Sequence, residues 1–291
     1  MKPFSKNPIK FTKKELLRLL TQFDKLYSKR PIKKNIHGMQ YPHMFATYCF
    51  LKKIKPVYVI ESGVHKGQST WLIEKTLPKA KLLSIDIDLS QLKYKSKKAK
   101  YSTIDFSKQN LKKISKNSLA FFDDHQNAFD RVLQCKKFGI KHLIFDDNYA
   151  PGTGDCYSLK QILSNSGYIR KIKLKEIKKM IKKILKETLK KYFNQNYVPN
   201  IDINELIWYL KFDNIAPNIK HKKALLKNTI IYQEFPPVFK TKKTRWNTDW
   251  NNKNYPTEEP ILDISKKDIY PTAYSEAMTY NWISYIKIKA N

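Results

Sequence analysis

Short apolar runs alternate with amphipathic segments through residues 56–148, and this alternation is the strongest structural signal in the chain. The main runs read VYVIES, AKLLSIDI, SLAFFDD and IKHLIFDD, with a weaker one in AKYSTIDFS. They are apolar without alternating, which is typical of strands in a parallel sheet that helices cover on both faces. QSTWLIEKTL and QNAFDRVLQCKKF between them have helical spacing. We therefore predict an α/β fold with a doubly wound, mainly parallel sheet.

The segments on either side of this core extend the prediction. Residues 12–28 have helical spacing after Thr12, a favourable N-cap with Glu15 three positions on, and YPHMFATYCFLKKI predicts a second helix. We expect these helices, within residues 1–55, to pack on a core of residues 56–167. NTIIYQEFPPVF and NWISYIKIKA predict that residues 227–291 complete the sheet with C-terminal strands, one of them antiparallel.

Residues 168–226 break the pattern with YIRKIKLKEIKKMIKKILKETLKKYF, which is dense in lysine and has Ile and Leu at helical intervals. We predict a helical insertion or cap. One reading is a basic amphipathic helix that lies on a membrane or an RNA. The reading we favour is a surface helix with a solvated lysine face.

The composition is that of a globular protein, with 41% hydrophobic residues among 291. No run of 18 apolar residues occurs, so we expect no membrane span. The first 20 residues lack the apolar core of a secretory signal, and three cysteines at unrelated spacings favour neither a disulfide framework nor a zinc site. We expect a cytoplasmic, reducing environment.

The formal net charge of +32 raises the question of a nucleic-acid partner. Only 5 of the 57 basic residues are arginines, the side chain that forks onto phosphates and base edges. A basic surface that is merely solvated is therefore the prediction we favour, and nucleic acid is the less favoured partner.

Acidic residues follow every predicted strand of the core. The strand ends carry Glu61, Asp86, Asp105, the run Asp123, Asp124 and His125, and the run Asp146, Asp147 and Asn148. Carboxyl ends of parallel strands meet at one edge of a sheet, where open α/β folds bind ligands. Clustered carboxylates repel one another, so this arrangement predicts a ligand and not only a fold.

The first strand leads into a glycine turn with a carboxylate in front of it, Glu61 before Gly63 and Gly67. A pyrophosphate at this turn would be repelled by Glu61, whereas an ammonium and a sulfonium would be attracted. Asp86 is placed to accept hydrogen bonds from ribose hydroxyls, and Asp105 from an adenine amino group. Together these groups describe S-adenosylmethionine.

VIESGVHKGQSTWLI resembles motif I of class I S-adenosylmethionine-dependent methyltransferases, with Asp86 as the motif II acid. FFDDHQNAFDRVLQCKKFGIKHLIFDDNY is similar to the paired acidic motifs of metal-dependent O-methyltransferases, both the catechol type and the sugar and cephalosporin-hydroxylase-like type. The resemblance covers roughly residues 38–160. It implies a Rossmann-like fold in which Glu61 and Ser69 hold the methionine part.

The resemblance also implies that Asp124, Asp147 and Asn148 bind Mg²⁺ or Mn²⁺, with Asp146 as a supporting or alternative ligand. Asp124 and His125 would be the catalytic residues, with His125 as general base. The catechol type has a lysine base two positions after this histidine. Here that position is Asn127, which favours the histidine-base, sugar-type chemistry.

The function we favour is O-methylation of a sugar or glycan hydroxyl, with Tyr149, Trp246, Trp250 and Tyr255 as candidates for stacking on sugar rings. The alternatives are an RNA methyltransferase that uses the basic surface and an inactive methyltransferase-like binding protein. At the level of residues, Asp123 or Asp124 could instead cap the helix near Gln126, and His125 could be structural.

Overall fold

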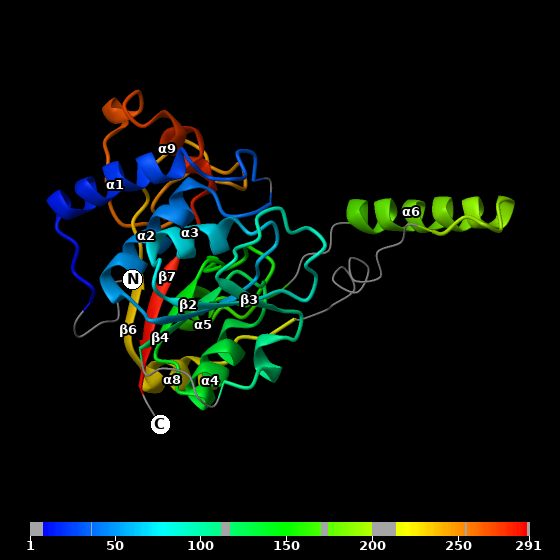
Figure 1. Ribbon diagram of the computed structural model, residues 1–291, viewed down its shortest axis with the longest axis horizontal. Helices are drawn as coiled ribbons and strands as arrows, with labels where there is room; N and C mark the ends of the chain where they lie inside the picture. Colours follow the sequence, from blue (N-terminus) through cyan, green and yellow to red (C-terminus); the bar gives the residue numbers. More distant parts are fainter. Residues whose placement is uncertain are drawn as a thin grey trace.

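The computed structural model describes residues 8–35, 37–111, 117–169, 174–199, 214–253 and 255–289, and its centre is one seven-stranded sheet (Figure 1). The strand order is β3-β2-β1-β4-β5-β7-β6. The strands are β1 (Tyr58–Ser62), β2 (Lys81–Ile85), β3 (Ala99–Ser102), β4 (Ser118–Phe122), β5 (His142–Phe145), β6 (Thr229–Glu234) and β7 (Ser284–Ile288).

Strands β1 to β5 run parallel, and β7 is antiparallel to both of its neighbours, β5 and β6. The parallel strands and the one reversed strand form a doubly wound, Rossmann-like sheet. The predicted fold class is confirmed, including the antiparallel strand near the C-terminus.

Helices cover both faces of the sheet because its central strands are apolar on both sides. In β1, Val59 belongs to one core cluster and Ile60 to the other, and both are fully buried. The first cluster includes residues of α1 (Lys13–Tyr27), α2 (Tyr41–Ile54) and α3 (Gln68–Thr76). The second includes residues of α4 (Ala128–Phe138), α5 (Leu159–Ser164) and α8 (Ile219–Asn228).

The first two helices begin close to where the sequence predicts. Thr12 caps α1, because its Oγ1 accepts a hydrogen bond from the backbone N–H of Glu15 over 3.1 Å. Residues 41–51 of α2 are all buried, which places this helix inside the first core cluster. Short helical turns also occur among the described residues: η1 (Phe106–Lys108), η2 (Ile264–Lys266), α9 (Pro271–Ser275) and η3 (Ala277–Thr279).

The lysine-rich segment contains α6 (Leu174–Phe193), which stands apart from the sheet and its covering helices in Figure 1. The proposed division of the chain at residues 55, 167 and 226 stays a prediction. No described helix combines the length and the apolar character that crossing a membrane requires.

Candidate functional site

The glycine turn joins β1 to α3 at the carboxyl edge of the sheet. Gly63 has φ +94°, and a Cβ on it would lie 2.0 Å from the carbonyl oxygen of Asp123. Gly67 has φ +88° and precedes the first residue of α3. Both positions need glycine for backbone conformation and for close approach, because a Cβ on Gly67 would lie 2.2 Å from the carbonyl oxygen of Tyr94. The turn therefore brings the end of β1 directly against the residues that follow β4.

Asp86, at the end of β2, holds the glycine turn in place. Its Oδ2 accepts hydrogen bonds from the backbone N–H groups of Val64 at 2.9 Å and His65 at 2.8 Å. Asp86 also lines a cavity of about 320 Å³ above the turn, together with Gly63 and His65. Its predicted contact with a ribose stays a prediction. The structure adds a second role, because the same carboxylate fixes the loop that a ligand would approach.

Glu61 lies beneath the turn and is fully buried. Its Oε2 accepts hydrogen bonds from the hydroxyls of Thr70 at 2.7 Å and Ser84 at 2.6 Å, and its Oε1 is buried without a partner. Burial raises the pKa of Glu61, and the hydroxyl donors partly offset this. Glu61, Gly67 and Ser69 are not among the described residues that line the cavity. Their predicted contacts with the methionine part stay predictions.

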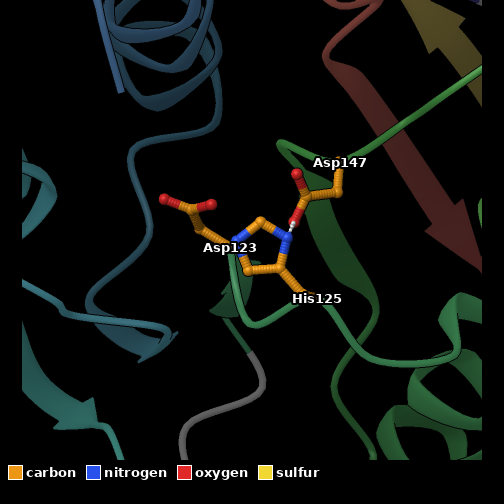
Figure 2. A group of neighbouring side chains, drawn as sticks. All are labelled: Asp123, His125 and Asp147. Atoms are coloured by element: carbon orange, nitrogen blue, oxygen red, sulfur yellow. Dashed lines mark ion pairs between the residues drawn. The ribbon is translucent and has the colours of Figure 1, made fainter. Parts of the chain in front are cut away.

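Asp123, His125 and Asp147 come together where β4 and β5 end. One possible ligand atom from each lies within 4.8 Å of the other two. Figure 2 shows the imidazole of His125 between the two carboxylates. Oδ2 of Asp147 is buried and makes no hydrogen bond within the described residues, although Nδ1 of His125 lies 3.3 Å from it. Carboxylate oxygens at such a position are suited to a cation.

The backbone of His125 is in the left-handed region, with φ +50°, which is costly for a residue with a side chain. Its Nδ1 lies 3.1 Å from Oδ1 of Asp155 and 3.3 Å from Oδ2 of Asp147. Carboxylates accept hydrogen bonds, so Nδ1 carries a proton, and Nε2 is the nitrogen that accepts one when the ring is in its neutral form. The negative charge of Asp147 raises the pKa of His125 well above its ordinary value, against the effect of burial and with the help of Asp155.

Burial raises the pKa of Asp147 to about 6, although the neighbouring His125 counteracts the effect. The other oxygen of Asp147, Oδ1, accepts a hydrogen bond from the hydroxyl of Tyr149 at 2.8 Å. Tyr149 therefore orients this carboxylate so that Oδ2 faces His125.

Asp124 faces away from this group and pairs with Arg131. Its Oδ2 accepts from the hydroxyl of Ser62 at 2.6 Å and from Nε of Arg131 at 2.9 Å. Arg131 is 4% exposed and also reaches Asp105, with Nη2 2.8 Å from Oδ2. This pairing differs from the predicted metal role of Asp124, because its carboxylate is bound by the buried guanidinium of Arg131. Asp123, one residue earlier, occupies the corresponding place beside His125.

Asp105, predicted to contact adenine, is the second acid on Arg131. Burial works to raise the pKa of Asp105, but hydrogen bonds from Arg131 and Ser107 outweigh it and hold the pKa well below its usual range. Sequence reasoning missed Arg131. The available signal was an arginine in a lysine-rich chain, seven residues after Asp124 and in the first turn of α4.

The side-chain nitrogen and oxygen of Asn148 are both hydrogen-bonded to other described residues. Its Nδ2 donates to the hydroxyl of Tyr232 at 2.9 Å and to the carbonyl of Trp282 at 3.0 Å. Its Oδ1 accepts from the backbone N–H of Lys160 at 2.9 Å. Asn148 thus ties β5 to β6 and β7, where the sequence predicted a metal ligand.

Asp146, predicted as a supporting or alternative ligand, pairs with a buried histidine of α2. Nδ1 of His43 lies 2.9 Å from Asp146, and Nε2 of His43 donates to the carbonyl of Thr279 at 2.7 Å. Nδ1 of His43 therefore faces the carboxylate of Asp146, while Nε2 is bound by the backbone.

A second cavity of about 330 Å³ adjoins the first on the side of α4. Both are lined by Asp105, His125, Gln126 and Arg131. The second is also lined by Asp155, whose Oδ1 lies 3.1 Å from Nδ1 of His125. A ligand that extends beyond the glycine turn has room along this groove.

Most of the aromatic residues predicted to stack on sugars lie inside the protein. Tyr149, Trp250 and Tyr255 are buried, the last two within a cluster completed by Tyr280 and Trp282. Trp246 packs against that cluster but is only partly buried, so it is the residue of the predicted set whose ring is partly exposed.

No protein-family model and no curated protein matches this chain. Similar solved structures include CmcI with SAH, at 14% identity and a TM-score of 0.36 over 52% of this chain and 82% of that one. An SAH-bound methyltransferase from Podospora anserina is 14% identical, with a TM-score of 0.36 over 48% of this chain and 68% of that one. The plantazolicin methyltransferase BpumL, in complex with a pentazolic desmethylPZN analog and SAH, is 15% identical. Its TM-score is 0.39 over 96% of this chain and 100% of that one. At such identities and scores, these likenesses transfer no residue role to this chain.

Proposed function

We propose that this protein is an S-adenosylmethionine-dependent O-methyltransferase that uses a divalent cation. The observation that carries the proposal is a single cavity whose lining includes Gly63 of the glycine turn and Asp86, which holds that turn, as well as Asp123 and His125. A methyl donor at the glycine turn would thus share one space with a base and with oxygen ligands for a metal.

The charge of the cavity supports the cofactor. Its lining includes four acids, Asp86, Asp105, Asp123 and Asp124, against the guanidinium of Arg131 and the imidazole of His125. This excess of negative charge suits a ligand that carries an ammonium and a sulfonium, and it disfavours a pyrophosphate. Asp86 would take the ribose hydroxyls, as acids at the end of a second strand do.

The donor set supports a hard cation. Asp123 and Asp147 bring carboxylate oxygens close together beside His125, which suits Mg²⁺ or Mn²⁺. We propose that these two acids hold the cation, and that His125 is the base and not a ligand. When bound, the cation would lower the pKa of an acceptor hydroxyl beside it.

The residues of this chain then have distinct tasks in the transfer. Asp155 and Asp147 orient the imidazole of His125 through Nδ1, so that Nε2 accepts the proton of the acceptor hydroxyl. The hydroxyl oxygen forms a bond to the methyl carbon while the carbon–sulfur bond breaks. Alignment of oxygen, carbon and sulfur is the main contribution of a rigid site to such a step.

For the acceptor we propose a sugar hydroxyl. A cation held by two acids can chelate neighbouring hydroxyl groups, which a sugar ring presents directly. Trp246 offers a partly exposed ring, with the guanidinium carbon of Arg245 5.5 Å from its centre. A terminal ribose also presents such a diol, so RNA is the competing acceptor.

Methyl transfer from labelled S-adenosylmethionine to common and 6-deoxy hexosides, measured beside total RNA, tests this choice. We expect label in a glycoside, with only a weak dependence on salt, because few of the basic residues are arginines. His125→Ala protein provides the matched blank. Label in RNA and in no glycoside, with binding that falls steeply as salt rises, would reverse the assignment.

A further inference from the structure

Helix α6 carries an apolar stripe that nothing in the described part of the chain covers. Ile181, Leu185 and Leu189 follow one another at four-residue intervals and are 48%, 56% and 54% exposed. Phe193 continues the series and is 83% exposed. Residues four apart lie on one side of a helix, so these side chains form a continuous face. Figure 1 shows α6 away from the sheet and its helices.

Lysines run beside this stripe at the same interval. Lys182, Lys186 and Lys190 line one groove together with Leu185, Leu189 and Phe193. Glu187, the acid in this part of the helix, already has partners. Its carboxylate pairs with Lys190 at 2.8 Å and accepts a hydrogen bond from the hydroxyl of Tyr197 at 2.7 Å. The face of α6 is therefore both apolar and positively charged.

This combination distinguishes among the candidate occupants. A second copy of α6 would bury the apolar stripe but would bring two rows of lysines together. RNA would pair with the lysines but would leave the aliphatic side chains of Leu185 and Leu189 in water. The surface of an anionic bilayer satisfies both, since it takes up apolar side chains at the level of the headgroups and attracts lysines whose stems reach outward.

We propose that α6 binds the surface of membranes that contain anionic phospholipid, lying in the plane of the interface with Leu185, Leu189 and Phe193 inserted. Lys182 and Lys186 contact the headgroups. The inference does not depend on the proposed methyl transfer. It replaces the predicted role of this segment as a helix whose lysine face is simply solvated.

Sedimentation of the full-length protein with vesicles tests the proposal. We expect binding to vesicles of phosphatidylcholine mixed with phosphatidylglycerol and at least about ten-fold weaker binding to phosphatidylcholine alone, because each lysine near an anionic surface adds to the attraction. Leu185→Ser with Leu189→Ser, and separately Lys182→Gln with Lys186→Gln, should each weaken binding by roughly ten-fold or more.

A matched control lies at η2, where Ile264 and Ile269 are exposed beside Lys266 and Lys267. Changing those isoleucines to serine, or those lysines to glutamine, should leave vesicle binding unchanged, and thermal unfolding should show that every variant is folded. The proposal would be overturned if the wild-type protein did not bind anionic vesicles. It would also be overturned if the control substitutions at η2 weakened vesicle binding as much as those in α6. The same holds if substitutions in the α6 stripe abolished RNA binding or dimerisation and left vesicle binding intact.

Discussion

His125→Ala should slow methyl transfer by roughly two to four orders of magnitude, the usual effect of removing a general base. The expectation rests on the protonation of the ring. Asp155 and Asp147 both face Nδ1, so in the neutral ring Nε2 is the nitrogen that can take a proton from the acceptor. Single-turnover rates with saturating cofactor measure the effect, and added imidazole should restore part of the lost rate.

Asp155→Asn serves as the partner variant for this experiment. It keeps the shape of the side chain but weakens the acceptor for Nδ1, so we expect a smaller loss than for His125→Ala. Binding of Mn²⁺ should persist in His125→Ala if the histidine is a base. A variant that turns over at the wild-type rate at neutral pH would make His125 structural, and one that loses Mn²⁺ would make it a ligand.

Asp147→Ala should abolish turnover and leave the affinity for S-adenosylhomocysteine nearly intact, because the cation serves the acceptor. Its Oδ2 is buried without a hydrogen-bond partner and is oriented by Tyr149 through the other oxygen. EDTA should have the same effect on the wild type, and Mg²⁺ or Mn²⁺ should reverse it. Full activity after exhaustive dialysis against EDTA would refute a catalytic metal.

Asp123 and Asp124 allow a sharper comparison in the same assay. We expect Asp123→Asn to weaken Mn²⁺ binding strongly, whereas Asp124→Asn should retain it and instead lower stability through the loss of charge opposite Arg131. The reverse result would restore the ligand role that the sequence predicts for Asp124 and would contradict the geometry described above.

The fold was predictable because its signals are local. Runs such as SLAFFDD and IKHLIFDD are apolar on both faces, which parallel strands between two helical layers require. The glycine turn was visible for a similar reason, since Gly63 allows a backbone approach that no other residue permits. The edge at which the acids collect then followed from the parallel order of the strands.

Which of two adjacent acids enters the site was not predictable from local pattern. Asp123 and Asp124 follow the end of β4, where the alternation of a strand no longer applies, and the loop turns through the positive φ of His125. Arg131, seven residues on in α4, decides the outcome by binding Asp124. Asn148 shows the same limit, because its partners Tyr232 and Trp282 come from the far end of the chain.

The central claim is that the glycine turn and its surrounding acids bind S-adenosylmethionine, and calorimetric titration with S-adenosylhomocysteine tests it most directly. We expect saturable binding that raises the melting temperature of the protein, as any ligand of the native state does, with no binding of NAD. Asp86→Ala should weaken it, since Asp86 lines the cavity and holds the backbone of Val64 and His65, whereas Asp88→Ala, just outside, should not. Folded protein that binds no S-adenosylhomocysteine, or that binds NAD equally well, would contradict the account.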